Sequence, residues 1–165
     1  MFTDIKTHFK GKVPGFLQAL ADADPALLRV TWAFYKKTLF ESSSLVNQRL
    51  KYMMLFETVR AHSKCQKCID VHAATMRDIG INDELLKELN QDISSSKILD
   101  EETKNLLIFA LYIASFDSRT KDQLDTKMLE GFTALVGQKK ITEVIMLVAT
   151  SKTMQDFIHL SHLGH

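Results

Sequence analysis

Cys65-Gln66-Lys67-Cys68-Ile69-Asp70-Val71-His72 is the stretch that decides how this sequence is interpreted, because it holds the only two cysteines in 165 residues. The cysteines are three residues apart, and His72 is the fourth residue after Cys68. On a helix this spacing places the three side chains on one stripe. Two thiols that can close on each other, with an imidazole base beside them, are the minimum set of groups for thiol redox chemistry.

The sequence on both sides of this motif predicts an all-α fold. Apolar residues recur at helical spacing, and no segment shows the period-two alternation of a strand. Asp24 and Asn82 are predicted N-caps, Ser63 is the predicted N-cap of the motif helix, and Gly80 is its predicted end. We expect a weakly patterned arm over 1–23, a polar loop over 91–97, and helices over 25–39, 46–61, 64–79, 83–90, 101–115, 121–136 and 139–163.

Composition narrows the class of protein. Hydrophobic residues make up 45% and charged residues 25%, with a formal net charge of +1 and no block of like charges, so a basic nucleic-acid-binding face is not expected. The polar start and the absence of about 20 consecutive apolar residues indicate neither a signal peptide nor a membrane span. We therefore expect a cytoplasmic protein, and in that compartment a close cysteine pair is more often catalytic or metal-binding than structural.

The neighbours of the cysteines suggest how a thiolate would form. A helix that begins near Ser63 would place unpaired amide groups beside Cys65, and their partial positive charge stabilises an anion. His72, one turn beyond Cys68, could take its proton. Glu57, eight residues before Cys65, could orient His72 as the third group of a proton relay, and His62 could serve as well.

Other uses of the same residues stay open. Cys65, Cys68 and His72 are acceptable zinc ligands, with His62 or Glu57 as a fourth, although structural zinc sites usually draw on a second paired cluster that this sequence lacks. A non-enzymatic thiol sensor or a general disulfide reductase would also need the pair. Redox chemistry without a cofactor or a resident metal is the interpretation that we favour.

The motif and its surroundings resemble the alkyl hydroperoxidase D and carboxymuconolactone decarboxylase family. The specific part of the resemblance is Cys65-x-x-Cys68-x-x-x-His72, followed by a small-residue helix that ends in glycine, Ala73-Ala74-Thr75-Met76-Arg77-Asp78-Ile79-Gly80. The stretches 24–35 and 99–102 are similar to the family's opening helix and to the start of a later one. The resemblance extends over most of the chain, from Pro14 onward.

The resemblance implies a single compact AhpD-like domain over 1–165, with the cysteines at the N-terminal end of a central helix. It implies a hydroperoxide reductase in which Cys68 attacks the peroxide, Cys65 resolves the product and His72 carries protons. The substrate would be an organic hydroperoxide, the electron donor a thiol, and the assembly a homo-oligomer, a trimer or a hexamer. The family's decarboxylase branch generally lacks the cysteine pair, so decarboxylase activity is not expected.

This sequence departs from the family's pattern at three places. The family's relay glutamate usually stands twelve residues before the first cysteine, where this chain has Met53. Glu57 lies one helical turn later on the same face and could substitute for it. The usual Asn-Gly turn is replaced by Ser63-Lys64, and the residues between the cysteines, Gln66 and Lys67, lack the aromatic or histidine often found there.

Overall fold

The chain is described by a computed structural model that covers all residues except 42–44, 63–64, 117–124 and 161–165. The described residues form helices and no strand, which confirms the predicted all-α class. The elements are α1 (Phe2–His8), α2 (Gly15–Ala23), α3 (Pro25–Leu39), α4 (Gln48–His62), α5 (Gln66–Asp78), α6 (Asp83–Leu89), the 3-10 helix η1 (Ile93–Ser95), α7 (Glu101–Ser115), α8 (Thr126–Val136) and α9 (Gln138–Leu160).

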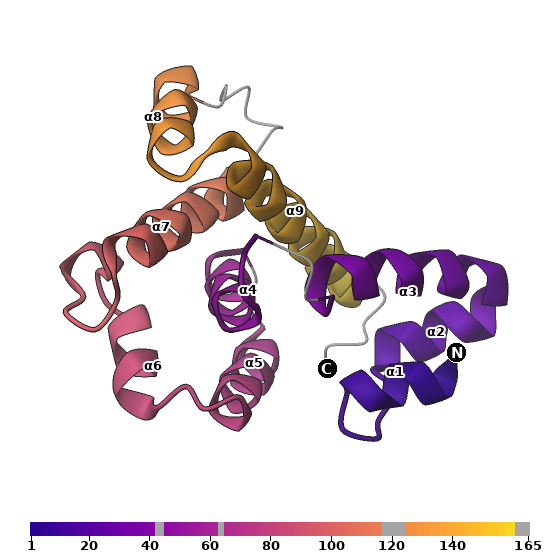
Figure 1. Cartoon of the computed structure of the whole chain (residues 1–165). Helices are drawn as coiled ribbons and strands as arrows, with labels where there is room; N and C mark the ends of the chain where they lie inside the picture. Colours follow the sequence, from indigo (N-terminus) through magenta and orange to yellow (C-terminus); the bar gives the residue numbers. More distant parts are fainter. Residues whose placement is uncertain (42–44, 63–64, 117–124, 161–165) are drawn as a thin grey trace.

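The larger hydrophobic core is built around α4, which packs against α5, α7 and α9 (Figure 1). Phe56 on α4, Leu107 and Phe109 on α7, and Val148 on α9 are at most 2% exposed. Met53, which stands where the family has its relay glutamate, is part of this core at 4% exposure.

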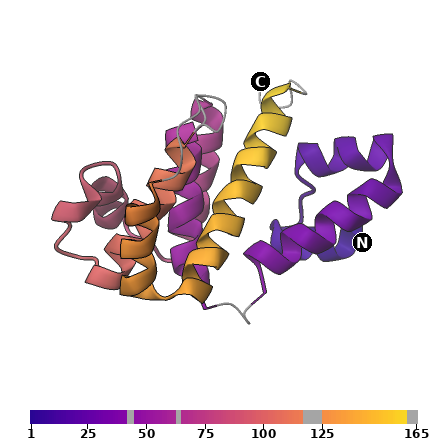
Figure 2. The same cartoon turned by 90° about the horizontal axis from the view of Figure 1, so that it is seen from above.

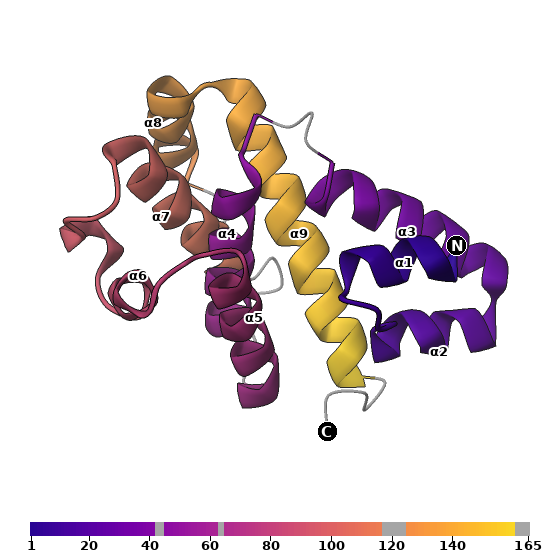
Figure 3. The same ribbon diagram turned by 60° about the horizontal axis from the view of Figure 1, so that its bottom comes forward.

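Helices α1, α2 and α3 form an N-terminal lobe on the other side of α9 (Figures 2 and 3). The lobe has a second apolar core, in which Leu17, Leu28 and Trp32 meet Met154 of α9. Asp4 ties α1 to α3, since it accepts hydrogen bonds from Nε1 of Trp32 at 2.7 Å and from Nζ of Lys36 at 2.8 Å. The segment 1–23, expected as a weakly patterned arm, thus contains two packed helices.

A buried lysine joins the lobe to the bundle. Nζ of Lys51 on α4, whose side chain is 2% exposed, donates to the carbonyl of Thr38 at 2.7 Å and lies 3.4 Å from Oε1 of Glu143 on α9. Oε2 of Glu143 accepts from the backbone amides of Leu45 and Val46, just before α4 begins. These contacts fix the position of the N-terminal end of α4 between the two hydrophobic cores.

Most predicted helix ends agree with the structure. Asp24 and Asn82 cap α3 and α6 with their side chains, and Gly80 follows α5 with a φ of +83° that favours glycine. The loop expected over 91–97 instead contains η1, because the buried Ile93 anchors it to the core. Residues 121–124 and 161–163, expected to be helical, lie outside the described residues. None of the helices in the described parts of the chain is long and apolar enough to cross a bilayer.

Candidate functional site

Cys65 and Cys68 form a disulfide at the start of α5, as the predicted redox pair requires. Their Cα atoms are 5.3 Å apart, and both residues are partly exposed. Cys65 itself is the N-cap, with an extended backbone and a sulfur that accepts a hydrogen bond from the amide of Cys68 at 3.2 Å. Ser63, the predicted cap, lies outside the described residues; the cap that the structure gives is Cys65, whose sulfur takes the place that a serine oxygen usually fills.

The cap geometry makes the two sulfurs different. An amide N–H at the beginning of a helix carries partial positive charge, and here the amide of Cys68 points to the sulfur of Cys65. When the disulfide is opened, this contact stabilises negative charge on Cys65. The sequence predicted a helix-terminus effect at Cys65, and the structure gives it a specific donor.

His72 lies one turn beyond Cys68 on α5, so that the two side chains are neighbours on one helix face. Burial lowers the pKa of His72 to about 4, because the protonated ring loses its hydration. Beside the closed disulfide at neutral pH, the ring is therefore uncharged. A neutral imidazole can accept a proton from a thiol, which is the role predicted for it.

Glu57 is fully buried in α4, and its two carboxylate oxygens have different surroundings. Oε2 accepts from Nη2 and Nε of Arg60 at 2.5 and 3.2 Å, whereas Oε1 has no hydrogen-bond partner among the described residues. Burial raises the pKa of Glu57 to about 7, although Arg60 opposes this. Glu57 is thus a group that gains and loses its proton near neutral pH.

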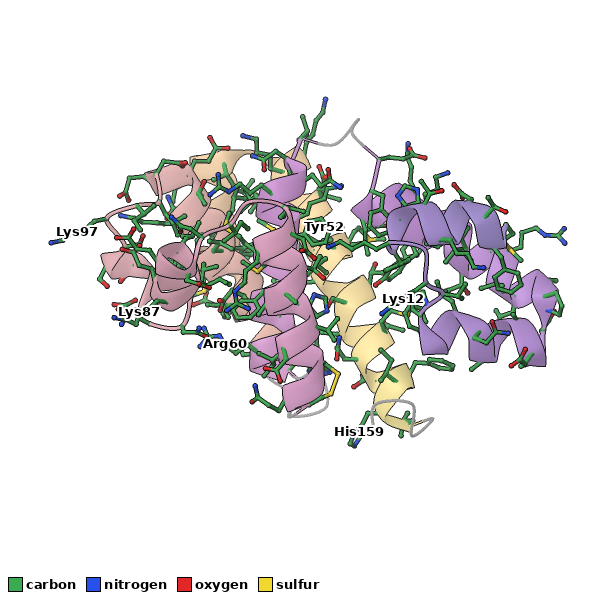
Figure 4. The ribbon with its side chains drawn as sticks, turned by 90° about the horizontal axis from the view of Figure 1, so that it is seen from below. Lys12, Tyr52, Arg60, Lys87, Lys97 and His159 are labelled. Carbon is green, nitrogen blue, oxygen red and sulfur yellow. A yellow bond between two sulfur atoms is a disulfide. The ribbon has the colours of Figure 1, made fainter. Side chains whose placement is uncertain are left out.

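The position of Arg60 bears on the predicted relay. Figure 4 shows Arg60 on one side of the α4–α5 pair and the yellow disulfide bond on the other side, next to the end of α9. The guanidinium that binds Oε2 of Glu57 therefore lies on the side away from the sulfurs. No interaction joins Glu57 to His72 within the described part of the chain, and the relay role of Glu57 stays a prediction.

His62 is the last residue of α4, three residues before Cys65, and it has a partner that the sequence did not indicate. Its Nε2 lies 2.9 Å from Oδ1 of Asp156 near the end of α9. The two residues are 94 positions apart, so only the packing of α9 against α4 brings them together. No spacing rule could have named Asp156.

The metal-binding alternative and a groove among the described residues concern the surroundings of the cysteines. Over the residues that the structure describes, no three His, Cys, Asp or Glu side chains are grouped so that they could hold a metal ion. An apolar groove of about 390 Å³ lies between α3 and α9, lined by residues such as Val30, Phe34 and Met146. The groove does not include the cysteines or His72.

Comparison with known proteins finds a similar structure but no similar sequence. No protein-family model matches the sequence, and no curated protein matches it at a significant level. A crystal structure of an Agrobacterium tumefaciens protein matches with a TM-score of 0.64 and 16% identity, over 84% of this chain and 90% of that one. That protein is described as being of unknown function and as a candidate antioxidant defence protein AhpD. The chain therefore has an AhpD-like fold, with its cysteine pair at the start of a helix.

Proposed function

We propose that this protein is a thiol-dependent hydroperoxide reductase that cycles between a dithiol and a disulfide. The observation that carries the proposal is the partly exposed Cys65–Cys68 disulfide at a helix start, one turn from the neutral imidazole of His72. The AhpD-like fold supports the same chemistry. The substrate class is an organic hydroperoxide, and the electrons come from an external thiol.

In the first half of the cycle, Cys68 attacks the terminal oxygen of the hydroperoxide. His72 takes the thiol proton and returns it to the departing alkoxide, so that an alcohol leaves and Cys68 becomes a sulfenic acid. Cys65 then attacks this sulfur. An S–S bond forms, the S–O bond breaks and water leaves, with both electrons supplied by the two thiols.

In the second half, an external thiol reopens the disulfide. Attack on the sulfur of Cys68 expels Cys65 as a thiolate, and the amide of Cys68 stabilises that leaving group. A second thiol then releases Cys68 from the mixed disulfide, so that two donor thiols become one donor disulfide. The capped sulfur is thus the better leaving group.

Counting alkylatable thiols by mass spectrometry tests the cycle. Reduced protein should lose two alkylatable thiols after one equivalent of organic hydroperoxide and regain them with a dithiol reductant. Cys68→Ser should abolish turnover, whereas Cys65→Ser should stop at a sulfenic acid on Cys68. Full peroxidase activity of Cys68→Ser would contradict the proposal.

The same samples separate the other functions. Faster reduction of a model disulfide than of the hydroperoxide would indicate a general disulfide reductase. Stoichiometric zinc in protein purified without a histidine tag would indicate a metal-binding module. Oxidation without turnover at any thiol concentration would indicate a sensor.

A further inference from the structure

The disulfide end of the molecule contains a carboxylate–imidazole pair that the proposed cycle does not use. Nε2 of His62, on the last residue of α4, lies 2.9 Å from Oδ1 of Asp156. The side chain of His62 is 23% exposed and that of Asp156 is 64% exposed, so that solvent reaches the pair. The pair joins the end of α4 to the last part of α9.

The hydrogen bond selects the tautomer of His62. A carboxylate only accepts hydrogen bonds, so Nε2 must carry the hydrogen that reaches Asp156. In the neutral ring the other nitrogen, Nδ1, is then the proton acceptor. The same hydrogen bond to Asp156 holds the imidazole in one orientation.

The chain connection places this base near one sulfur. His62 and Cys65 are three residues apart, so that their Cα atoms are at most about 11 Å from one another even in a fully extended chain. Figure 4 shows the disulfide beside the last part of α9, where His159 is labelled and where Asp156 also lies, while Arg60 is on the opposite side of the α4–α5 pair. His62 is bonded to Asp156 in this last part of α9, whereas the partner of Glu57, Arg60, lies on the side opposite the sulfurs.

We propose that His62, oriented by Asp156, takes the proton of the Cys65 thiol in the step that closes the disulfide. This inference rests on the proposed function. The Cys65 thiolate attacks the sulfenic sulfur of Cys68, the S–S bond forms as the S–O bond breaks, and the proton held by His62 passes to the departing hydroxide to give water. His62 thus serves Cys65 as His72 serves Cys68, and Asp156 is a positioning residue.

Single-turnover kinetics test the assignment, because the two chemical steps can be followed separately. Reduced protein is mixed with one equivalent of an organic hydroperoxide, and a dione that alkylates sulfenic acids is added at timed intervals. In His62→Gln the peroxide should be consumed at the normal rate, while the sulfenic acid on Cys68 should persist about 100-fold longer. In His62→Ala, added imidazole should shorten that lifetime again.

Two further variants separate a chemical role from a structural one. Asp156→Asn should lengthen the sulfenic acid lifetime by roughly 10-fold, since a neutral amide replaces the charged acceptor that orients the ring of His62. His159→Gln, in the same last part of α9, is the matched control and should close the disulfide at the normal rate. Disulfide closure at the normal rate in His62→Gln would overturn the inference.

A second readout does not depend on peroxide chemistry. In protein carrying Cys68→Ala, His62→Gln should slow alkylation of Cys65 by iodoacetamide at neutral pH, because the thiolate is the reacting form. An unchanged alkylation rate would overturn the inference. If the reduced wild-type protein failed to react with hydroperoxide at all, the proposed function would fail, while slower alkylation in His62→Gln would still support proton transfer from Cys65 to His62.

Discussion

Two adjacent helices of this protein, α4 and α5, differ sharply in burial. On α4 the buried side chains run from Leu50 to Val59 with the exception of Tyr52, and they include charged ones. On α5 only Met76 is buried among the described side chains, while Val71 is 59% exposed. The helix that carries the cysteines is thus a surface helix supported by a buried one.

This difference in burial explains how the disulfide can be held in a fixed position and still be accessible to an external thiol. A disulfide that must exchange electrons with an external thiol has to be accessible, yet its sulfurs and bases need defined positions. The buried α4 supplies the fixed support, and the exposed α5 supplies access. The ionisable groups follow the same division: Glu57 is held inside α4, whereas His62 lies at its end beside α9.

The largest expected effect comes from the apolar support of α4. Phe56→Ala should lower the free energy of unfolding by about 3 to 5 kcal/mol, because the side chain is 2% exposed and leaves a cavity. Val71→Ala on α5 should change it by less than about 0.5 kcal/mol. Urea unfolding of the oxidised variants measures both. Equal losses would contradict the division between support and surface.

The ionisation of Glu57 should give the next largest effect. Burial raises its pKa from 4.5 to about 7, so the folded state binds the proton more tightly than the unfolded state. Stability should therefore fall as pH rises from 4.5 to about 7, by up to roughly 3 kcal/mol. Glu57→Gln has no such ionisation, and its stability relative to wild type should rise over that window.

Urea unfolding of both proteins at pH 4.5, 5.5, 6.5 and 7.5 gives the difference directly and cancels the other titrating groups. Arg60→Gln is a useful companion, because removing the opposing guanidinium should enlarge the pH dependence. A constant difference between Glu57→Gln and wild type across this range would show that the buried carboxyl does not titrate there.

A feature of the fold or of the site could be predicted from the sequence when the residues that form it are close together in the chain. The start of α3 was predictable because Asp24 caps the amide of Ala26 two residues away and Pro25 follows. The cysteine pair at a helix start was predictable for the same local reason. The pairing of His62 with Asp156 was not, because it depends on how α9 crosses the end of α4.

The N-terminal segment shows a second limit. Helices α1 and α2 are short, and their pattern in the sequence is weak because each buries only a few side chains, such as Ile5 and Leu17, against α3 and α9. Tertiary packing rather than local propensity stabilises such helices. The cap at Cys65 was missed for a different reason: cysteine is not among the residues that normally cap helices.

His72 should give a smaller pH effect of opposite sign. Burial lowers its pKa from 6.5 to about 4, so the folded state binds the proton more weakly than the unfolded state. Stability should therefore fall as pH drops from 6.5 to about 4, by roughly 2 kcal/mol once partial exposure of the ring is allowed for. His72→Gln in the oxidised protein should lose this dependence, and His159→Gln should keep it.

The smallest effect is expected on the exposed face of α5, where Nε2 of Gln66 donates to Oδ1 of Asp70 at 2.8 Å. Solvated pairs four residues apart on a helix contribute about 0.2 to 0.5 kcal/mol. A double-mutant cycle with Gln66→Ala and Asp70→Ala should return a coupling of that size, whereas Asp70→Asn should keep most of it because the amide oxygen still accepts. A coupling free energy above about 1 kcal/mol would mean that a binding partner, rather than water, covers this face of α5. The difference in burial between α4 and α5 would then be a property of the isolated chain and not of the assembled protein.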